Sequence, residues 1–266
     1  MYLGLALAAT LGLACLGGAE PMLLDTGYDQ MYNLQFEQAH RTFAEFQRVD
    51  PQNPMGPVSD AAAYLFTEFD RLHILQSEFF VNDEHFYTDG KLAPDPALKT
   101  KFEADLNRAS ELAAKTPADP NATFAALLSH GLRSDYLALI EKRYGAAFRE
   151  MKTARALAEQ LLSAHPEYYD AWIAIGVENY MLSVKPAPIR WLLRLSGGQT
   201  DRGLGIEKLK LTAEKGHYLA PFARLLLAVA ALRDRDKGKA RDLLASLARD
   251  FPRNPLYTHE LAGLSD

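Results

Sequence analysis

The chain is poor in the residue patterns that most directly support catalysis or covalent cross-linking. Its single cysteine, Cys15, cannot form an internal disulfide. No G-x-S-x-G, H-E-x-x-H or phosphate-cradling glycine loop occurs, and the seven histidines are scattered. We therefore expect no cofactor, no resident metal ion, and a function based on binding rather than catalysis.

The charge pattern also lacks the features of nucleic-acid and membrane-spanning proteins. The net charge is −5, and the basic residues form no stripe with interleaved aromatic side chains. After the N-terminal segment, no apolar run approaches the length of about 18 residues that a membrane span needs. The sequence predicts no nucleic-acid partner and no transmembrane span in the mature chain.

The N-terminal segment has the composition of a secretory leader. Residues 3–16 carry no charge, and Gly17, Gly18 and Ala19 follow this apolar run. We predict a signal peptide over residues 1–19 and export of residues 20–266 to the periplasm or the medium. Two alternatives are a buried first helix and a lipid anchor at Cys15, although Gly12 stands where a lipid-attachment motif has a large aliphatic residue.

A proline-terminated pattern recurs along the rest of the chain. A small or polar residue is followed four positions later by a packing residue and eight positions further by a proline, which ends a helix. The copies are Ala39, Phe43 and Pro51; Asp105, Ala109 and Pro117; Ala154, Ala158 and Pro166; and Ala240, Leu244 and Pro252. Three of these prolines are followed by a polar residue and a second proline, which predicts a turn and the start of the next helix.

The segment after Pro166 resembles the first-helix signature of the tetratricopeptide repeat. Trp172, Ile175-Gly176 and Asn179-Tyr180 follow the pattern W-x₂-L-G-x₂-Y, with Tyr180 one place late. Because the small residue lets two helices approach closely, this pattern is typical of helical hairpins. The resemblance implies an all-α, irregular tetratricopeptide-like solenoid of hairpins that coil as a right-handed superhelix.

The predicted domain contains five antiparallel hairpins and a terminal helix, with no strand. The hairpins cover residues 22–49, 57–116, 121–163, 168–216 and 219–250, and the cap covers 255–264. Two insertions interrupt the array, one at 79–96 and one at 183–202. Tyr64, Phe66 and Phe69 are expected in the core. Phe79, Phe80, Phe86 and Tyr87 are expected either to fold back or to form a contact surface.

In this superfamily the first helices line a concave groove, which would here be mostly apolar. The lining residues implied by the resemblance, with Trp191 of the second insertion, are Met55, Val58, Ala62, Leu65, Asp170, Ile173, Val177, Tyr180, Phe222, Leu225, Val229 and Leu232. The groove lacks the Lys, Arg and Asn with which some members clamp a peptide carboxylate. Either the groove binds an apolar helix or lipid-like ligand, or residues 189–195 fill it.

Three functions remain open at this stage. The first is an exported scaffold that binds a protein or peptide in the cell envelope. The second is a carrier of an apolar small molecule or lipid in the groove. The third is an enzyme with its site in the 79–96 loop, where Asp83, Glu84, His85 and Asp89 cluster, although no known metal spacing fits them. Residues 189–195 could also contact a membrane surface, with Trp191 at the interface.

Overall fold

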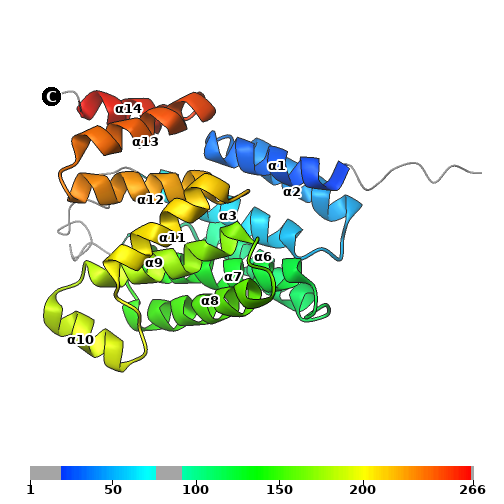
Figure 1. Cartoon of the computed structure of the whole chain (residues 1–266). Coiled ribbons are helices and arrows are strands. Elements are labelled where there is room, and N and C mark those ends of the chain that lie inside the picture. The colour runs from blue at the N-terminus through cyan, green and yellow to red at the C-terminus, as the bar shows by residue number, and fades with distance from the viewer. Residues whose placement is uncertain (1–18, 76–91, 265–266) are drawn as a thin grey trace, which may run out of the picture.

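The computed structural model describes residues 19–75 and 92–264, and within these ranges the protein is all-α. Consecutive helices pack as antiparallel pairs (Figure 1). The first helices of the five pairs are α1 (Ala19–Tyr32), α3 (Met55–Arg71), α7 (Pro120–Asp135), α9 (Trp172–Ser183) and α12 (Ala220–Arg233). Their partners are α2 (Phe36–Val49), α6 (Pro96–Ala113), α8 (Tyr144–Ala164), α11 (Arg202–Lys215) and α13 (Lys237–Asp250).

Two further helices complete the described chain. Helix α14 (Pro255–Gly263) packs on α13, and the short helix α10 (Ala187–Leu195) lies between α9 and α11 in the sequence. The sequential packing of neighbouring helices is consistent with helical hairpins. Within residues 19–75 and 92–264 no strand occurs, and no helix there is both long and apolar enough to cross a membrane.

The recurring polar–proline turns work as helix caps. Asp119 accepts a hydrogen bond from the backbone N–H of Asn121, and Asn254 accepts one from Leu256. In both helices the next residue is proline, which has no N–H to leave unsatisfied and whose fixed φ suits the first helical position. The polar residue and the proline that follows it therefore form the N-terminal caps of α7 and α14.

Small residues bring the paired helices close together, as the sequence predicts. Ala39, Ala154 and Ala240 are fully or almost fully buried. A Cβ atom placed on Gly176 of α9 would lie 3.0 Å from the backbone nitrogen of Leu209 in α11. Gly176 thus lies where these two helices touch. Phe66 and Phe69 are buried, as expected, and Tyr64 packs on the core.

Gly205 of α11 leaves even less room for a side chain than Gly176, which gives a testable prediction. A Cβ atom on Gly205 would lie 2.6 Å from the backbone nitrogen of Tyr180, and backbone cannot move aside cheaply. We expect Gly205→Ala to lower the free energy of unfolding by about 2 kcal/mol. Gly263→Ala in α14 is the control, because a Cβ there meets nothing within 4 Å. Equal stabilities of the two variants in urea denaturation would contradict this packing.

The first and last pairs contact each other. The Tyr32 hydroxyl donates to the carbonyl oxygen of Tyr218 at 3.0 Å, and the Asn254 amide donates to the carbonyl oxygen of Tyr32 at 2.9 Å. The rings of Tyr28 and Tyr218 stack with their centroids 4.7 Å apart. These contacts hold the first and last pairs of the described chain against each other.

The second insertion does not fill the space between the first helices, which corrects one of the two alternatives for the groove. Helix α10 projects from the body of the protein (Figure 1). None of its residues is buried, and the Trp191 side chain is 65% exposed. The physical reason is that its loops are hydrogen-bonded to α8 and α9, which holds the helix outside.

Candidate ligand cavity

An apolar cavity lies where the first helices of all five pairs converge. It is lined from α1 by Tyr28, Met31 and Tyr32; from α3 by Ala62 and Phe66; from α7 by Leu127, Leu128, Gly131, Leu132, Ser134 and Asp135; from α8 by Met151 and Ala154; from α9 by Ile173, Ala174 and Val177; and by Leu219 and Phe222 at α12. Its volume is about 90 Å³. A space of this size suits a short alkyl chain or one small ring.

Aromatic side chains form one wall of the cavity. The ring of Phe66 packs edge-on against Tyr32, at 6.1 Å between centroids, and against Phe222 at 5.9 Å. These contacts join α1, α3 and α12, so the wall is held by three separate pairs. Burial raises the pKa of both Tyr28 and Tyr32 well above the usual value, so the two phenols stay neutral. The wall therefore presents rigid, uncharged surface to the cavity.

Asp135 places a carboxyl group at this apolar cavity. It is the last residue of α7, and among the described residues none donates a hydrogen bond to its side chain. Loss of solvation raises the pKa of Asp135 from its ordinary value to about 7. The carboxyl therefore changes charge near neutral pH. In these apolar surroundings, a ligand that donates a hydrogen bond or carries a positive charge would stabilise it.

The backbone changes from an α-helix to one wide turn immediately after Asp135. Tyr136–Ile140 forms a π-helical turn, and the Arg143 N–H then reaches back to the carbonyl oxygen of Leu137 at 2.8 Å. Such turns insert an extra residue into a helix and often occur at functional sites, because they re-aim the neighbouring side chains. Here Asp135 directly precedes the turn, and Tyr136 and Leu137, the first two residues of the turn, are buried.

The structure divides the residues that the sequence assigned to the groove. Ala62, Ile173, Val177 and Phe222 line the cavity. Leu225 borders a much smaller hollow between α1, α3 and α14. The other apolar residues of the set do not border the cavity. Leu232 is half-buried, and the rest are buried between helices: Met55, Val58, Leu65, Tyr180 and Val229. Trp191 lies on α10, outside the cavity.

Asp170, expected to line the groove, instead joins two hairpins. Its carboxylate accepts hydrogen bonds from the backbone N–H groups of His217, Tyr218 and Leu219, each at 3.0 Å. The side chain is only 4% exposed. It therefore satisfies the otherwise unpaired N–H groups that precede α12, and its role is to hold the fourth pair against the fifth.

The loop proposed as an enzyme site lies mostly outside the described residues. This applies to Asp83, Glu84, His85 and Asp89, and to Phe79, Phe80, Phe86 and Tyr87. Residues 1–18 of the predicted leader, including Cys15, are also outside them, and its last residue, Ala19, begins α1. In residues 19–75 and 92–264, no group of three or more His, Cys, Asp or Glu side chains is placed to hold a metal ion.

Comparison with protein-family models, with curated proteins and with solved structures finds no match to this chain. The assignment of function therefore depends on the geometry of the cavity and on the surface around it.

Proposed function

We propose that this protein is an exported, tetratricopeptide-like helical binding protein that holds a small apolar ligand with an amine or hydroxyl group in the cavity at Asp135. One observation carries the proposal: five first helices converge on an apolar cavity whose only carboxyl group, Asp135, has no hydrogen-bond donor among the described residues. Ligand cavities are typically apolar, with a few polar groups that orient the ligand. The apolar walls would take the alkyl or ring part.

The ionisation of Asp135 makes the proposed selectivity dependent on pH. Above pH 7 the carboxylate is charged and attracts an ammonium group, whereas well below pH 7 it is neutral and acts as an ordinary hydrogen-bonding group. Affinity for a cationic ligand should therefore rise as the pH increases through about 7. A neutral alcohol gains little from the charged form, and a carboxylate ligand is repelled by it.

Three six-carbon probes test this selectivity: hexylamine, hexanol and hexanoate. At pH 8 we expect hexylamine to bind about tenfold more tightly than hexanol, and hexanoate to bind least; at pH 5 the amine and the alcohol should differ little. Asp135→Asn should abolish the preference for the amine. The matched control is Asp105→Asn, because burial also raises the pKa of Asp105 to about 7 although this residue does not line the cavity.

The result of this titration decides the proposal. Failure of all three probes to bind the wild-type protein would exclude the cavity as a site for small apolar ligands. An amine preference that survives in Asp135→Asn, or that disappears in Asp105→Asn, would contradict the assigned role of Asp135. Isothermal titration calorimetry at the two pH values gives the three affinities directly.

A scaffold for a protein or peptide in the cell envelope is the second proposal. It is supported by the sequential pairing of helices, the arrangement that helical-repeat scaffolds use. We place it second because the contact between the first and last pairs leaves the inner face less open to a peptide. Mild pull-down from envelope extract tests it, and recovery of no partner would count against it.

A further inference from the structure

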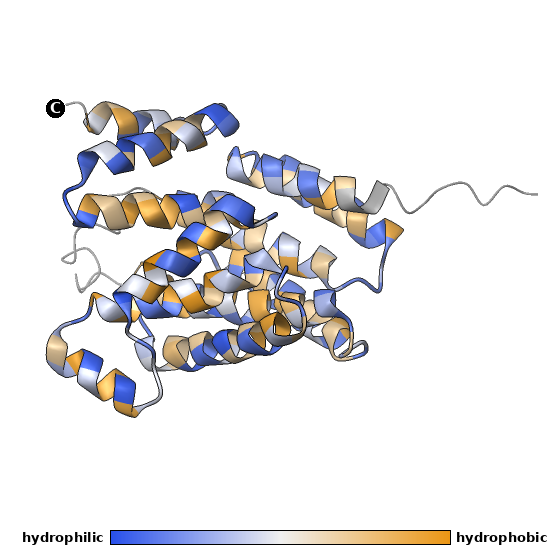
Figure 2. Cartoon of the chain, viewed as in Figure 1, coloured by the Kyte–Doolittle hydropathy of each residue, from blue (hydrophilic) through white to orange (hydrophobic). Residues whose placement is uncertain are grey.

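Helix α10 presents a large apolar surface to solvent. Trp191 and Leu195 are each 65% exposed and Leu192 is 59% exposed. Its two arginines hydrogen-bond to oxygen atoms beside the helix, and Arg194 remains exposed. Arg190 donates to the carbonyl oxygen of Lys185 at 2.9 Å, and Arg194 donates to the Thr200 hydroxyl at 2.5 Å. Figure 2 shows the apolar residues along this projecting helix.

Both ends of α10 are fixed, so its exposed face is not the result of a loose loop. Pro188 lies in its first turn. At the other end Gly197 adopts a φ of +82°, and the Gly198 N–H donates to the carbonyl oxygen of Leu193 at 2.8 Å. This backbone arrangement is a Schellman cap, which glycine favours because the left-handed conformation strains residues with a side chain.

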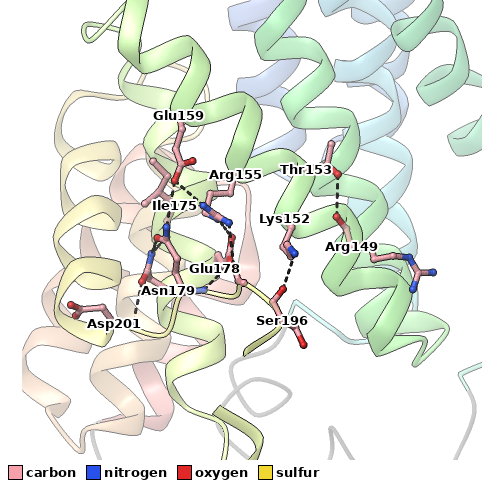
Figure 3. A network of polar contacts seen from close by, with 12 residues as sticks. Arg149, Lys152, Thr153, Arg155, Glu159, Ile175, Glu178, Asn179, Ser196 and Asp201 are labelled. Carbon is pink, nitrogen blue, oxygen red and sulfur yellow. Dashed lines mark hydrogen bonds and ion pairs between the residues drawn. The ribbon is translucent and has the colours of Figure 1, made fainter. Parts of the chain in front are cut away.

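The loop after α10 is anchored by polar side chains of α8 and α9 (Figure 3). The Glu178 carboxylate accepts the backbone N–H of Gln199 at 3.0 Å and is paired with Arg155 at 2.8 Å. Asn179 accepts the N–H of Asp201 at 3.0 Å, and Lys152 donates to the carbonyl oxygen of Ser196 at 2.7 Å. Glu178 and Asn179 are completely buried. Two buried side chains of α9 therefore fix the loop that follows α10.

The charge of this segment indicates what covers its apolar face. Residues 183–200 contain three basic residues, Lys185, Arg190 and Arg194, and no acidic residue, although the whole chain has a net charge of −5. The exposed apolar patch is on the order of a few hundred Å², which is small beside the roughly 800 Å² that each partner contributes to a stable protein–protein interface. A short helix with exposed Trp and Leu and adjacent positive charge instead suits shallow insertion into an anionic bilayer.

We propose that α10 docks the protein on an anionic lipid surface, with Trp191, Leu192 and Leu195 inserted at the boundary between headgroups and acyl chains. Lys185, Arg190 and Arg194 then lie at headgroup level, where their charge attracts anionic lipid. The polar anchors of Figure 3 keep the body of the protein in a fixed orientation above the surface.

Trp191 is itself the reporter for the test. The full chain is mixed at low salt with vesicles of phosphatidylcholine alone, or of phosphatidylcholine with one third phosphatidylglycerol. We expect a blue shift of tryptophan emission with the anionic vesicles, reduced as salt screens the charges. Trp191→Phe should still bind but lose the shift, which separates α10 from Trp172 and from the apolar segment at residues 3–16.

A double variant, Leu192→Gln with Leu195→Gln, keeps the reporter and removes the apolar contact. It should need at least about tenfold more anionic lipid for the same shift, whereas Met22→Gln, at a residue 66% exposed outside α10, should behave like the wild type. No shift with either vesicle, an equal shift with both, or a double variant that binds like the wild type would overturn the proposal. Binding of a protein partner through α10 without any lipid-dependent shift would also overturn it. Hexylamine affinity should be unchanged in these variants, so this test and the cavity test fail independently.

Discussion

Asp170→Ala should lower the free energy of unfolding by about 4 kcal/mol at pH 7. The substitution leaves the N–H groups of His217, Tyr218 and Leu219 without their shared acceptor, in a place where the carboxylate is almost fully buried. An unsatisfied buried donor costs more than an ordinary hydrogen bond contributes, and here the loss falls where two helical pairs meet. Urea denaturation followed by circular dichroism measures the change.

Asp236→Ala is the control for this prediction. Asp236 also caps a helix, but it is exposed, and among the described residues its side chain accepts a single hydrogen bond, from the N–H of Lys239 at 3.0 Å. Its loss should cost about 1 kcal/mol. If Asp170→Ala costs no more than Asp236→Ala, the junction between the fourth and fifth pairs does not depend on this carboxylate, and the helices are held there by apolar packing alone.

The second large effect is expected from filling the cavity. A Cβ atom at Gly131 would meet nothing within 4 Å, and Gly131 lines the cavity from α7. Gly131→Leu should therefore occupy the space meant for ligand and lower hexylamine affinity at least about tenfold. Because glycine disfavours a helix interior, the same change should raise the free energy of unfolding by about 1 kcal/mol.

A rise in the free energy of unfolding together with a fall in hexylamine affinity would show that the added side chain fills the site. A variant that had lost its fold would be less stable. Gly145→Leu on α8 is the control, since a Cβ there also meets nothing within 4 Å and Gly145 does not line the cavity. It should leave hexylamine affinity unchanged. A Gly131→Leu protein that binds hexylamine as tightly as the wild type would show that ligand lies elsewhere, and a loss of both stability and affinity would show that the cavity is too tight for the added side chain.

The pairing of helices could be predicted from the sequence because its signals are local. Prolines after Ala39, Ala154 and Ala240 end one helix, and the polar–proline turns start the next within a few residues. Small residues at helix contacts are likewise visible in the sequence, as Gly176 illustrates. These features depend on backbone geometry within one or two turns, so a single sequence is enough to read them.

The contact between the first and last pairs could not be predicted, because it joins residues far apart in the chain. Tyr32 and Tyr218 are separated by 186 positions, and Tyr32 and Asn254 by 222. Nothing in the repeat pattern requires these side chains to meet. The exposure of α10 could not be predicted for a different reason. Its apolar residues outnumber its arginines, which suggests burial, but the structure leaves Trp191, Leu192 and Leu195 exposed.

Asp135 was overlooked although the sequence contains a signal for it. Leu128, Leu132 and Leu139 lie on one helical face at spacings of four and seven residues, and Asp135 falls on that face between the last two. A carboxyl group on an apolar stripe is a candidate site residue, because burying it unpaired is costly. What the sequence does not reveal is the π-helical turn that follows, or that five helices meet beside it.

The most direct test of the cavity as a ligand site is nuclear magnetic resonance of methionine methyl groups during titration with hexylamine at pH 8. Met31 and Met151 line the cavity, whereas Met22 is exposed on the surface and Met55 is buried away from the cavity. We predict that the methyl signals of Met31 and Met151 shift together with a single saturation curve while those of Met22 and Met55 stay in place. Unmoved signals from Met31 and Met151 at saturating hexylamine, or a shift confined to Met22, would contradict the account.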